Sequence, residues 1–317
     1  MAKFCGSILN MFDPKTVLLI SLILVTIWFI WAWARLAREG RGKDPNDPAE
    51  HHKLYHHIVG FVANFFDTLG IGSFATTTSA FKFRKSIDDR KIPGTLNVGH
   101  ALPTVAQALI YIAIVQVEVW TLILMIVAAV LGAWFGAGVI AKWSRRKVQV
   151  GMGCALIVAA IFMLRAQLFG GQADDTGTLG LTGMQLGIGL IGNFALGALM
   201  SLGIGLYAPC LILISLLGMN PRAGFPIMMG SCAFLMPIGG LRFIKESSYS
   251  LPAAIGLAIG GVPAVLIAAY IVKSLPLTYV RWLVVIVVLY AAIMMLRSAM
   301  RNRTAEPAPV QPGTVTE

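Results

Sequence analysis

The stretch FFDTLGIGSFATTT, from Phe65 to Thr78, lies inside an apolar run that extends from residue 58 to residue 83. It contains one acid, two glycines and five hydroxyl side chains. A membrane-spanning helix is predominantly apolar over about 20 residues, and a loop in water is not flanked by so many apolar side chains. The stretch therefore predicts backbone that turns inside a membrane, where protein or a water-filled cavity covers it.

Composition indicates a polytopic membrane protein. Only 12% of the residues are charged and 57% are hydrophobic, and the first apolar run lacks a signal-peptide cleavage site. The four cysteines form no CxxC pair, so neither a disulfide framework nor a zinc site is predicted. The net charge of +11 is explained by basic cytoplasmic loops rather than by nucleic acid. The hydrophobic segments are 16–34, 58–83, 93–117, 119–141, 148–168, 185–217, 225–244, 251–273 and 278–297.

An internal repeat divides the chain. LGIG occurs at Leu69–Gly72 and again at Leu202–Gly205. The same difference in residue number separates the starts of the later hydrophobic segments in the first half from the starts of the corresponding segments in the second. We predict two repeats, 57–169 and 184–297, joined by a linker, 170–183. Residues 1–56 hold one extra transmembrane helix and a basic joint, and the Pro-rich tail, 298–317, is predicted to be disordered.

The distribution of positive charge favours two re-entrant hairpins. If all nine segments cross, the 25 Lys and Arg residues divide 14 to 11 between the two sides. If 58–83 and 185–217 are re-entrant segments that enter and leave the membrane on the same side, the Lys and Arg residues divide 19 to 6, which obeys the positive-inside rule. The fold class predicted is an all-α membrane protein with seven crossings, the N-terminus outside and the C-terminus inside. Each half has one hairpin and three crossings, which makes the halves an inverted repeat, a plan of secondary transporters.

The two hairpin turns predict an anion site. Glycines permit the tight turns, and the half-helix that follows each turn begins with free N–H groups and the positive end of its dipole. Such helix ends bind anions, and inversion aims both at one point near mid-bilayer. The turn residues are Gly70, Gly72, Gly203, Gly205 and Pro209. The expected substrate-binding residues are Ser73, Ala75, Thr76, Thr77, Asn97, His100, Tyr207, Ala208 and Ser231.

Several side chains keep two interpretations each. Asp67, an acid near the membrane centre, would either couple transport to a proton or cation or cap the turn. His100 would either pair with an anion or with Asp67, or simply pack. Asn64 would bind an oxyanion or satisfy free backbone, and Gly256 and Gly260 are assigned to close helix packing. No metal site is predicted, and the histidines at 51, 52, 56 and 57 remain without an assigned role.

The duplicated segments carry a family resemblance. LGIGSFATT followed by RKIPGTLN, and LGIGLYAPCLI followed by NPRAGFPIMMGS, resemble the sulfite exporter TauE/SafE family, also called the toluene sulfonate uptake permeases, over 57–297. The family has a run of consecutive glycines before a Pro-x-Leu motif, and this run is shorter here. The second repeat keeps the motif as Pro209-Cys210-Leu211, whereas the first repeat has Thr76 in place of its proline. The resemblance implies a permease for sulfite, sulfonates or sulfoacetate-like anions in the bacterial cytoplasmic membrane.

The function expected is therefore secondary transport of a sulfur-containing or organic anion, coupled to protons or sodium. A passive anion channel is the alternative, because the same helix ends would serve it. An enzyme is not expected, since no HExxH, no Ser-x-x-x-Lys and no acid pair at helical spacing lies in the apolar runs. No cofactor and no nucleic acid are expected. The partners expected are the anion, its coupling ion and the lipid bilayer, and a homodimer remains open.

Overall fold

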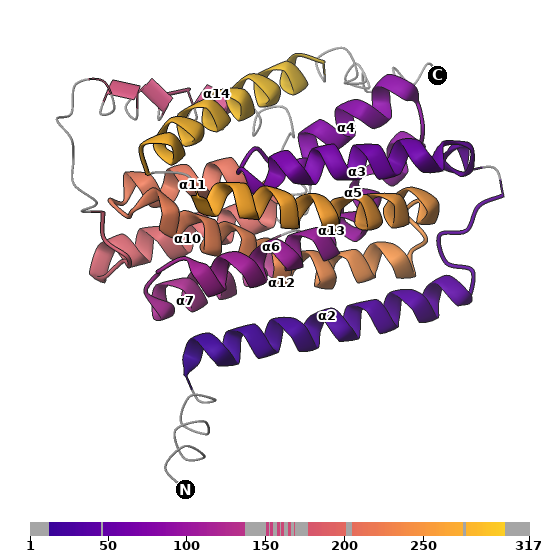
Figure 1. The fold of residues 1–317 in the computed structure, drawn as a ribbon. Coiled ribbons are helices and arrows are strands. Elements are labelled where there is room, and N and C mark those ends of the chain that lie inside the picture. Colours follow the sequence, from indigo (N-terminus) through magenta and orange to yellow (C-terminus); the bar gives the residue numbers. More distant parts are fainter. Residues whose placement is uncertain are drawn as a thin grey trace, which may run out of the picture.

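The computed structural model describes residues 13–45, 47–136, 177–200, 205–274 and 277–301, together with scattered positions between 150 and 168. Every named element in these residues is helical, as the sequence predicts (Figure 1). The helices are α2 (Pro14–Arg38), α3 (Lys53–Thr68), α4 (Ser73–Arg84), α5 (Ile92–Gly99), α6 (Ala101–Ile114), α7 (Val119–Leu131), α10 (Gly183–Met200), α11 (Tyr207–Leu216), α12 (Pro221–Lys245), α13 (Leu251–Ser274) and α14 (Leu277–Arg301).

Five stretches of the described residues are long and apolar enough to cross a membrane. They are Pro14–Arg38, Asp89–Ile114, Gly183–Met200, Pro221–Lys245 and Leu251–Ile271. Two further apolar helical stretches, Val119–Phe135 and Tyr207–Leu216, are shorter. About half of the predicted segment 148–168, part of the linker and most of the predicted tail lie outside the described residues.

Helices α3 and α4 form a hairpin around the opening stretch. The turn begins at Leu69, and Gly70 and Gly72 have φ values of 99° and 85°, which favour glycine. At the far end, the Tyr55 hydroxyl donates to the Ala80 carbonyl at 2.8 Å, and the Arg84 guanidinium lies 5.0 Å from the centre of the Tyr55 ring. The start of α3 and the end of α4 therefore lie at the same end of the molecule.

Helices α10 and α11 form a second pair whose outer ends also meet. The Thr178 N–H, just before α10, donates to the Gly218 carbonyl at 3.2 Å. The Asn220 N–H, just after α11, returns a bond to the Thr178 carbonyl at 3.0 Å. The connection between these helices includes residues 201–204 and hence Gly203, which lie outside the described residues.

The two hairpins open toward opposite ends of the molecule. Helix α12 has 25 residues, which corresponds to about 37 Å, and it starts directly after Asn220. Beyond its other end, the Tyr249 hydroxyl donates to the Arg41 carbonyl at 3.2 Å, and the Ser250 N–H donates to Thr95 Oγ1 at 2.9 Å. That end also holds the joint after α2, because Lys91 Nζ lies 2.8 Å from Asp44 Oδ2.

The predicted segment 93–117 is two helices with a break at His100. Helix α5 ends at Gly99 and α6 begins at Ala101. Pro103 has no N–H to offer to the Gly99 carbonyl, which removes the hydrogen bond that would continue the helix there. The break leaves His100, fully buried, at the junction between α5 and α6.

Helix α3 of the first half packs closely along α13 of the second. A Cβ atom added to Gly60 would lie 2.7 Å from the Leu257 backbone, and one added to Gly256 would lie 2.7 Å from the His56 Cβ. A Cβ atom on Gly260 would collide with the His57 carbonyl. The assignment of Gly256 and Gly260 to helix packing is thus confirmed, and it fits small residues at membrane helix interfaces.

Candidate functional site

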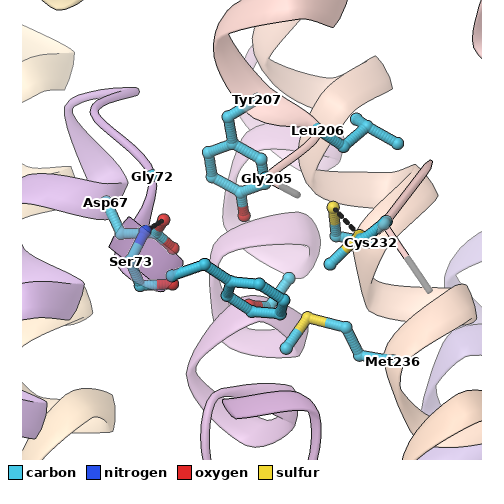
Figure 2. Close-up of a pocket in the computed structure, with 11 residues that line it drawn as sticks. Asp67, Gly72, Ser73, Gly205, Leu206, Tyr207, Cys232 and Met236 are labelled. Atoms are coloured by element: carbon cyan, nitrogen blue, oxygen red, sulfur yellow. Dashed lines mark hydrogen bonds between the residues drawn. The ribbon is translucent and has the colours of Figure 1, made fainter. Parts of the chain in front are cut away.

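A small cavity lies where the two hairpin turns approach each other (Figure 2). Its first-half lining comes from α3, the following turn, α4 and α6, and its second-half lining from α10, α11 and α12. Figure 2 shows Asp67 and Ser73 on one side, Cys232 and Met236 on the other, and Tyr207 between them. The lining residues are Asp67, Gly72, Ser73, Phe74, Thr104, Met200, Gly205, Leu206, Tyr207, Cys232 and Met236.

Asp67 is the acid of this cavity and is almost fully buried. Its Oδ1 accepts the backbone N–H of Ser73 at 2.5 Å, and its Oδ2 accepts Gln107 Nε2 at 2.9 Å. Ser73 is the first residue of α4, so the carboxylate caps the helix that follows the turn. A buried acid is tolerated in a membrane protein when such partners and a cavity surround it.

Gln107, on α6, connects the acid to the second half. Its Oε1 accepts the Tyr207 hydroxyl at 2.6 Å, while its Nε2 donates to Asp67 and, at 3.0 Å, to Thr68 Oγ1. All the hydrogen-bonding atoms of this buried amide are therefore used. The sequence analysis missed Gln107. Its amide lies inside an otherwise apolar segment, where a polar side chain normally has a hydrogen-bonding partner, and this could have marked it as a candidate.

His100 belongs to a second polar chain, which runs beside the first. Its Nδ1 lies 3.1 Å from Asn64 Oδ1, and its Nε2 lies 3.0 Å from Thr77 Oγ1. Asn64 Nδ2 donates to the Gly60 carbonyl at 2.7 Å, so the Asn64 oxygen faces the histidine. Nδ1 then carries the proton and Nε2 accepts from Thr77. This geometry holds α3, α4 and the α5–α6 junction together.

Of the expected substrate-binding residues, Ser73 and Tyr207 line the cavity, together with the turn glycines Gly72 and Gly205. Thr76 donates its hydroxyl to the Ser73 carbonyl at 2.8 Å. Asn97 Nδ2 donates to the Pro93 carbonyl, and Ser231 accepts from Asn193 Nδ2. The residues that do not line the cavity of the described part of the chain are Ala75, Thr76, Thr77, Asn97, His100, Ala208 and Ser231.

Helices α4 and α11 both begin at the cavity. Ser73 opens α4 and Tyr207 opens α11, and Pro209 occupies the first turn of α11, where its missing N–H costs nothing. Each helix start carries roughly half a positive charge. No Lys or Arg is among the lining residues that the structure describes. The backbone dipoles of the two helix starts therefore contribute positive partial charge at a cavity that also contains the Asp67 carboxyl.

The four histidines of the first joint do not form one cluster around an ion. His56 is fully buried against the edge of Phe81, with ring centres 5.4 Å apart, whereas His51 is exposed. His57 Nδ1 lies 2.7 Å from the Lys53 carbonyl. Their assignment stays open.

The apolar helices and the buried polar cavity define a multi-pass α-helical membrane protein. A family model described as sulfite exporter TauE/SafE matches residues 2–163, just over half of the chain, and the chain belongs to this family of membrane transporters. The match includes the N-terminal helix, which the sequence analysis set apart from the repeats, and it ends before the second half. No curated protein and no solved structure matches the chain.

Proposed function

We propose that this protein is a secondary transporter that moves a sulfur-containing or organic anion, such as sulfite, a sulfonate or sulfoacetate, across the bacterial cytoplasmic membrane. The observation that carries the proposal is the cavity lined by residues of both turns, at which α4 and α11 begin. Fixed dipoles attract an anion without a full buried charge, which would hold it too tightly for release. Family membership supports the same class of cargo.

The arrangement of the hairpins supports alternating access. The α3–α4 pair opens at the end that holds Arg41 and Lys91, and the α10–α11 pair opens at the end that holds Asn220. We place the first end in the cytoplasm, because the 19-to-6 division of Lys and Arg puts the basic joints there. Each hairpin would then enter the bilayer from its own side, and the chain would form an inverted repeat about the cavity.

Labelling of single cysteines tests this topology. Cysteines placed at Arg84 and at Arg145 are expected to react only with reagent on the cytoplasmic side. The hairpin 58–83 returns the chain to that side before Arg84, and two crossings, 93–117 and 119–141, bring it back before Arg145. A cysteine at Lys15 is expected to react from outside. Labelling of the Arg84 and Arg145 positions from opposite sides would contradict the double hairpin.

Uptake into proteoliposomes tests the function and separates transporter from channel. Purified protein should accumulate radiolabelled sulfite, sulfoacetate or a simple sulfonate inside vesicles above the outside concentration when a proton gradient is imposed. Accumulation should vanish when an ionophore collapses the gradient. Uptake that only reaches equal concentrations under every ion gradient would indicate the passive channel, and no uptake of any of these anions would reject the proposal.

A further inference from the structure

We propose that the Asp67 carboxylate is a tethered competitor of the transported anion, and that a proton must neutralise it before the anion can bind. The inference rests on the proposed function and assigns the coupling step within it. The carboxylate occupies the start of α4, which is the position that the transported anion needs (Figure 2). One proton and one anion would then move in the same direction.

The geometry places the carboxylate at the anion's expected position. Ser73 N is the first N–H of α4, and it points at Asp67 Oδ1 across a turn that Gly70 and Gly72 make possible. Oδ2 accepts from Gln107. These two donors are N–H groups, so each oxygen accepts a hydrogen bond, as the oxygens of an ionised carboxylate do. The helix start is thus filled by an anion that belongs to the chain itself.

A second anion in the same cavity would meet the Asp67 charge at close range. Like charges disfavour each other strongly when water is excluded. No Lys or Arg of the described lining compensates the pair. Protonation of Asp67 removes the negative charge and converts one oxygen into an O–H donor. The neutral carboxyl accepts the Ser73 N–H more weakly than the carboxylate does, so the incoming anion can displace it there.

The other titratable groups around Asp67 do not replace it in this role. Tyr207 of α11 and Cys232 of α12 line the cavity, and Tyr111 of α6 donates to the Thr68 carbonyl. Tyrosine and cysteine ordinarily keep their protons at neutral pH. His100 faces Asn64 and Thr77 rather than the acid. Asp67 is therefore the group of the described cavity whose charge changes as a proton arrives.

Asp67 is also one member of a hydrogen-bonded chain that reaches the second half. In the described state, Tyr207 holds Gln107, and Gln107 holds Asp67, so the acid joins the first turn to the second. When a proton and an anion replace the carboxylate's contact with Ser73, the Gln107 bond to Asp67 is free to change as well. The event that admits the anion thus changes one partner of Gln107, the residue whose amide accepts the Tyr207 hydroxyl.

Binding measured against pH tests the competition. Methanesulfonate is a suitable probe, because a sulfonate stays ionised between about pH 5 and about pH 8, whereas a carboxyl can titrate. Wild-type protein is expected to bind it more weakly as pH rises, by about 5–150-fold, the usual range of coupling between two ligands. Asp67→Asn, which is neutral at every pH, should bind it tightly with no such dependence.

Glu118→Gln is the matched control. Glu118 also caps a helix start, since its oxygens accept the N–H groups of Trp120 and Thr121, but it does not line the cavity. Burial raises the pKa of Glu118 while the hydrogen bonds from Thr121 and Trp120 lower it, and the net shift is downward. The Glu118→Gln protein should keep the wild-type pH dependence. A pH dependence that persists unchanged in Asp67→Asn would overturn the competition.

Proton uptake by the wild-type protein gives a second test that needs no variant. Coupling is reciprocal, so methanesulfonate added to weakly buffered protein should draw protons from solution at some pH within the same range. Binding without proton uptake at any pH would contradict the inference while leaving anion transport intact. Absence of binding and uptake for every anion tested would instead reject the proposed function, so the two failures are distinguishable.

Discussion

Replacement of Gly260 by alanine is expected to cause a large loss of stability. The new Cβ would collide with the His57 carbonyl and lie 3.0 Å from the Phe61 nitrogen. These neighbours are backbone atoms, so no side chain can turn away, and α3 must shift from α13. We expect the free energy of unfolding to fall by about 3 kcal/mol, the upper part of the usual cost of overpacking. Thermal unfolding in detergent, followed by tryptophan fluorescence, measures this.

Gly187→Ala is the control for that experiment. Gly187 lies in α10, and a Cβ atom added there has nothing within 4 Å. Its replacement should be neutral or raise the stability by up to about 1 kcal/mol, because alanine is the better helix former. If Gly260→Ala unfolds at the wild-type temperature, the close approach of α3 and α13 is wrong.

The second large effect is expected for Gln107→Leu. The change leaves Asp67 Oδ2, Thr68 Oγ1 and the Tyr207 hydroxyl without the amide that joins them. Each buried polar group left unpaired costs about 1–3 kcal/mol. Because the amide also links the acid to the second turn, we expect proton-driven anion uptake to fall by at least about tenfold, which corresponds to about 1.4 kcal/mol.

Uptake by proteoliposomes and thermal unfolding should be measured on the same Gln107→Leu preparation. Gln116→Leu is the matched control, since it makes the same change on an exposed residue beyond the end of α6. That variant should transport and unfold like the wild type. Normal proton-driven uptake by Gln107→Leu would show that the bridge between Asp67 and Tyr207 has no part in transport.

The repeat predicted the turn residues of the cavity lining but not the residues that other helices contribute. LGIG occurs in both halves, and this pattern pointed to Gly72, Ser73, Gly205 and Tyr207, all of which line the cavity. Turn chemistry is local, so a short motif is enough to find it. Thr76 was chosen for its hydroxyl, but that group donates to its own helix backbone, a choice that composition does not reveal.

Residues from other helices could not be found in the same way. Gln107 reaches Asp67 across 40 positions of sequence, and nothing local specifies that distance. The break at His100 was foreseeable from Pro103, yet the sequence analysis treated 93–117 as one segment. The sulfur-bearing wall, with Met200, Cys232 and Met236, has the composition of an ordinary helix core, so only the tertiary arrangement places it at the cavity.

A ligand-bound structure tests the central claim most directly. Crystals grown at about pH 4, where an ordinary aspartic acid is about half protonated, should be soaked with 2-bromoethanesulfonate, whose bromine gives an anomalous signal. We predict the sulfonate at the start of α4, within hydrogen-bonding distance of Ser73 N, with the Asp67 side chain withdrawn from that nitrogen. A sulfonate bound only at the basic joints, with Asp67 still on Ser73 N in a protein that transports the same anion, would contradict the account.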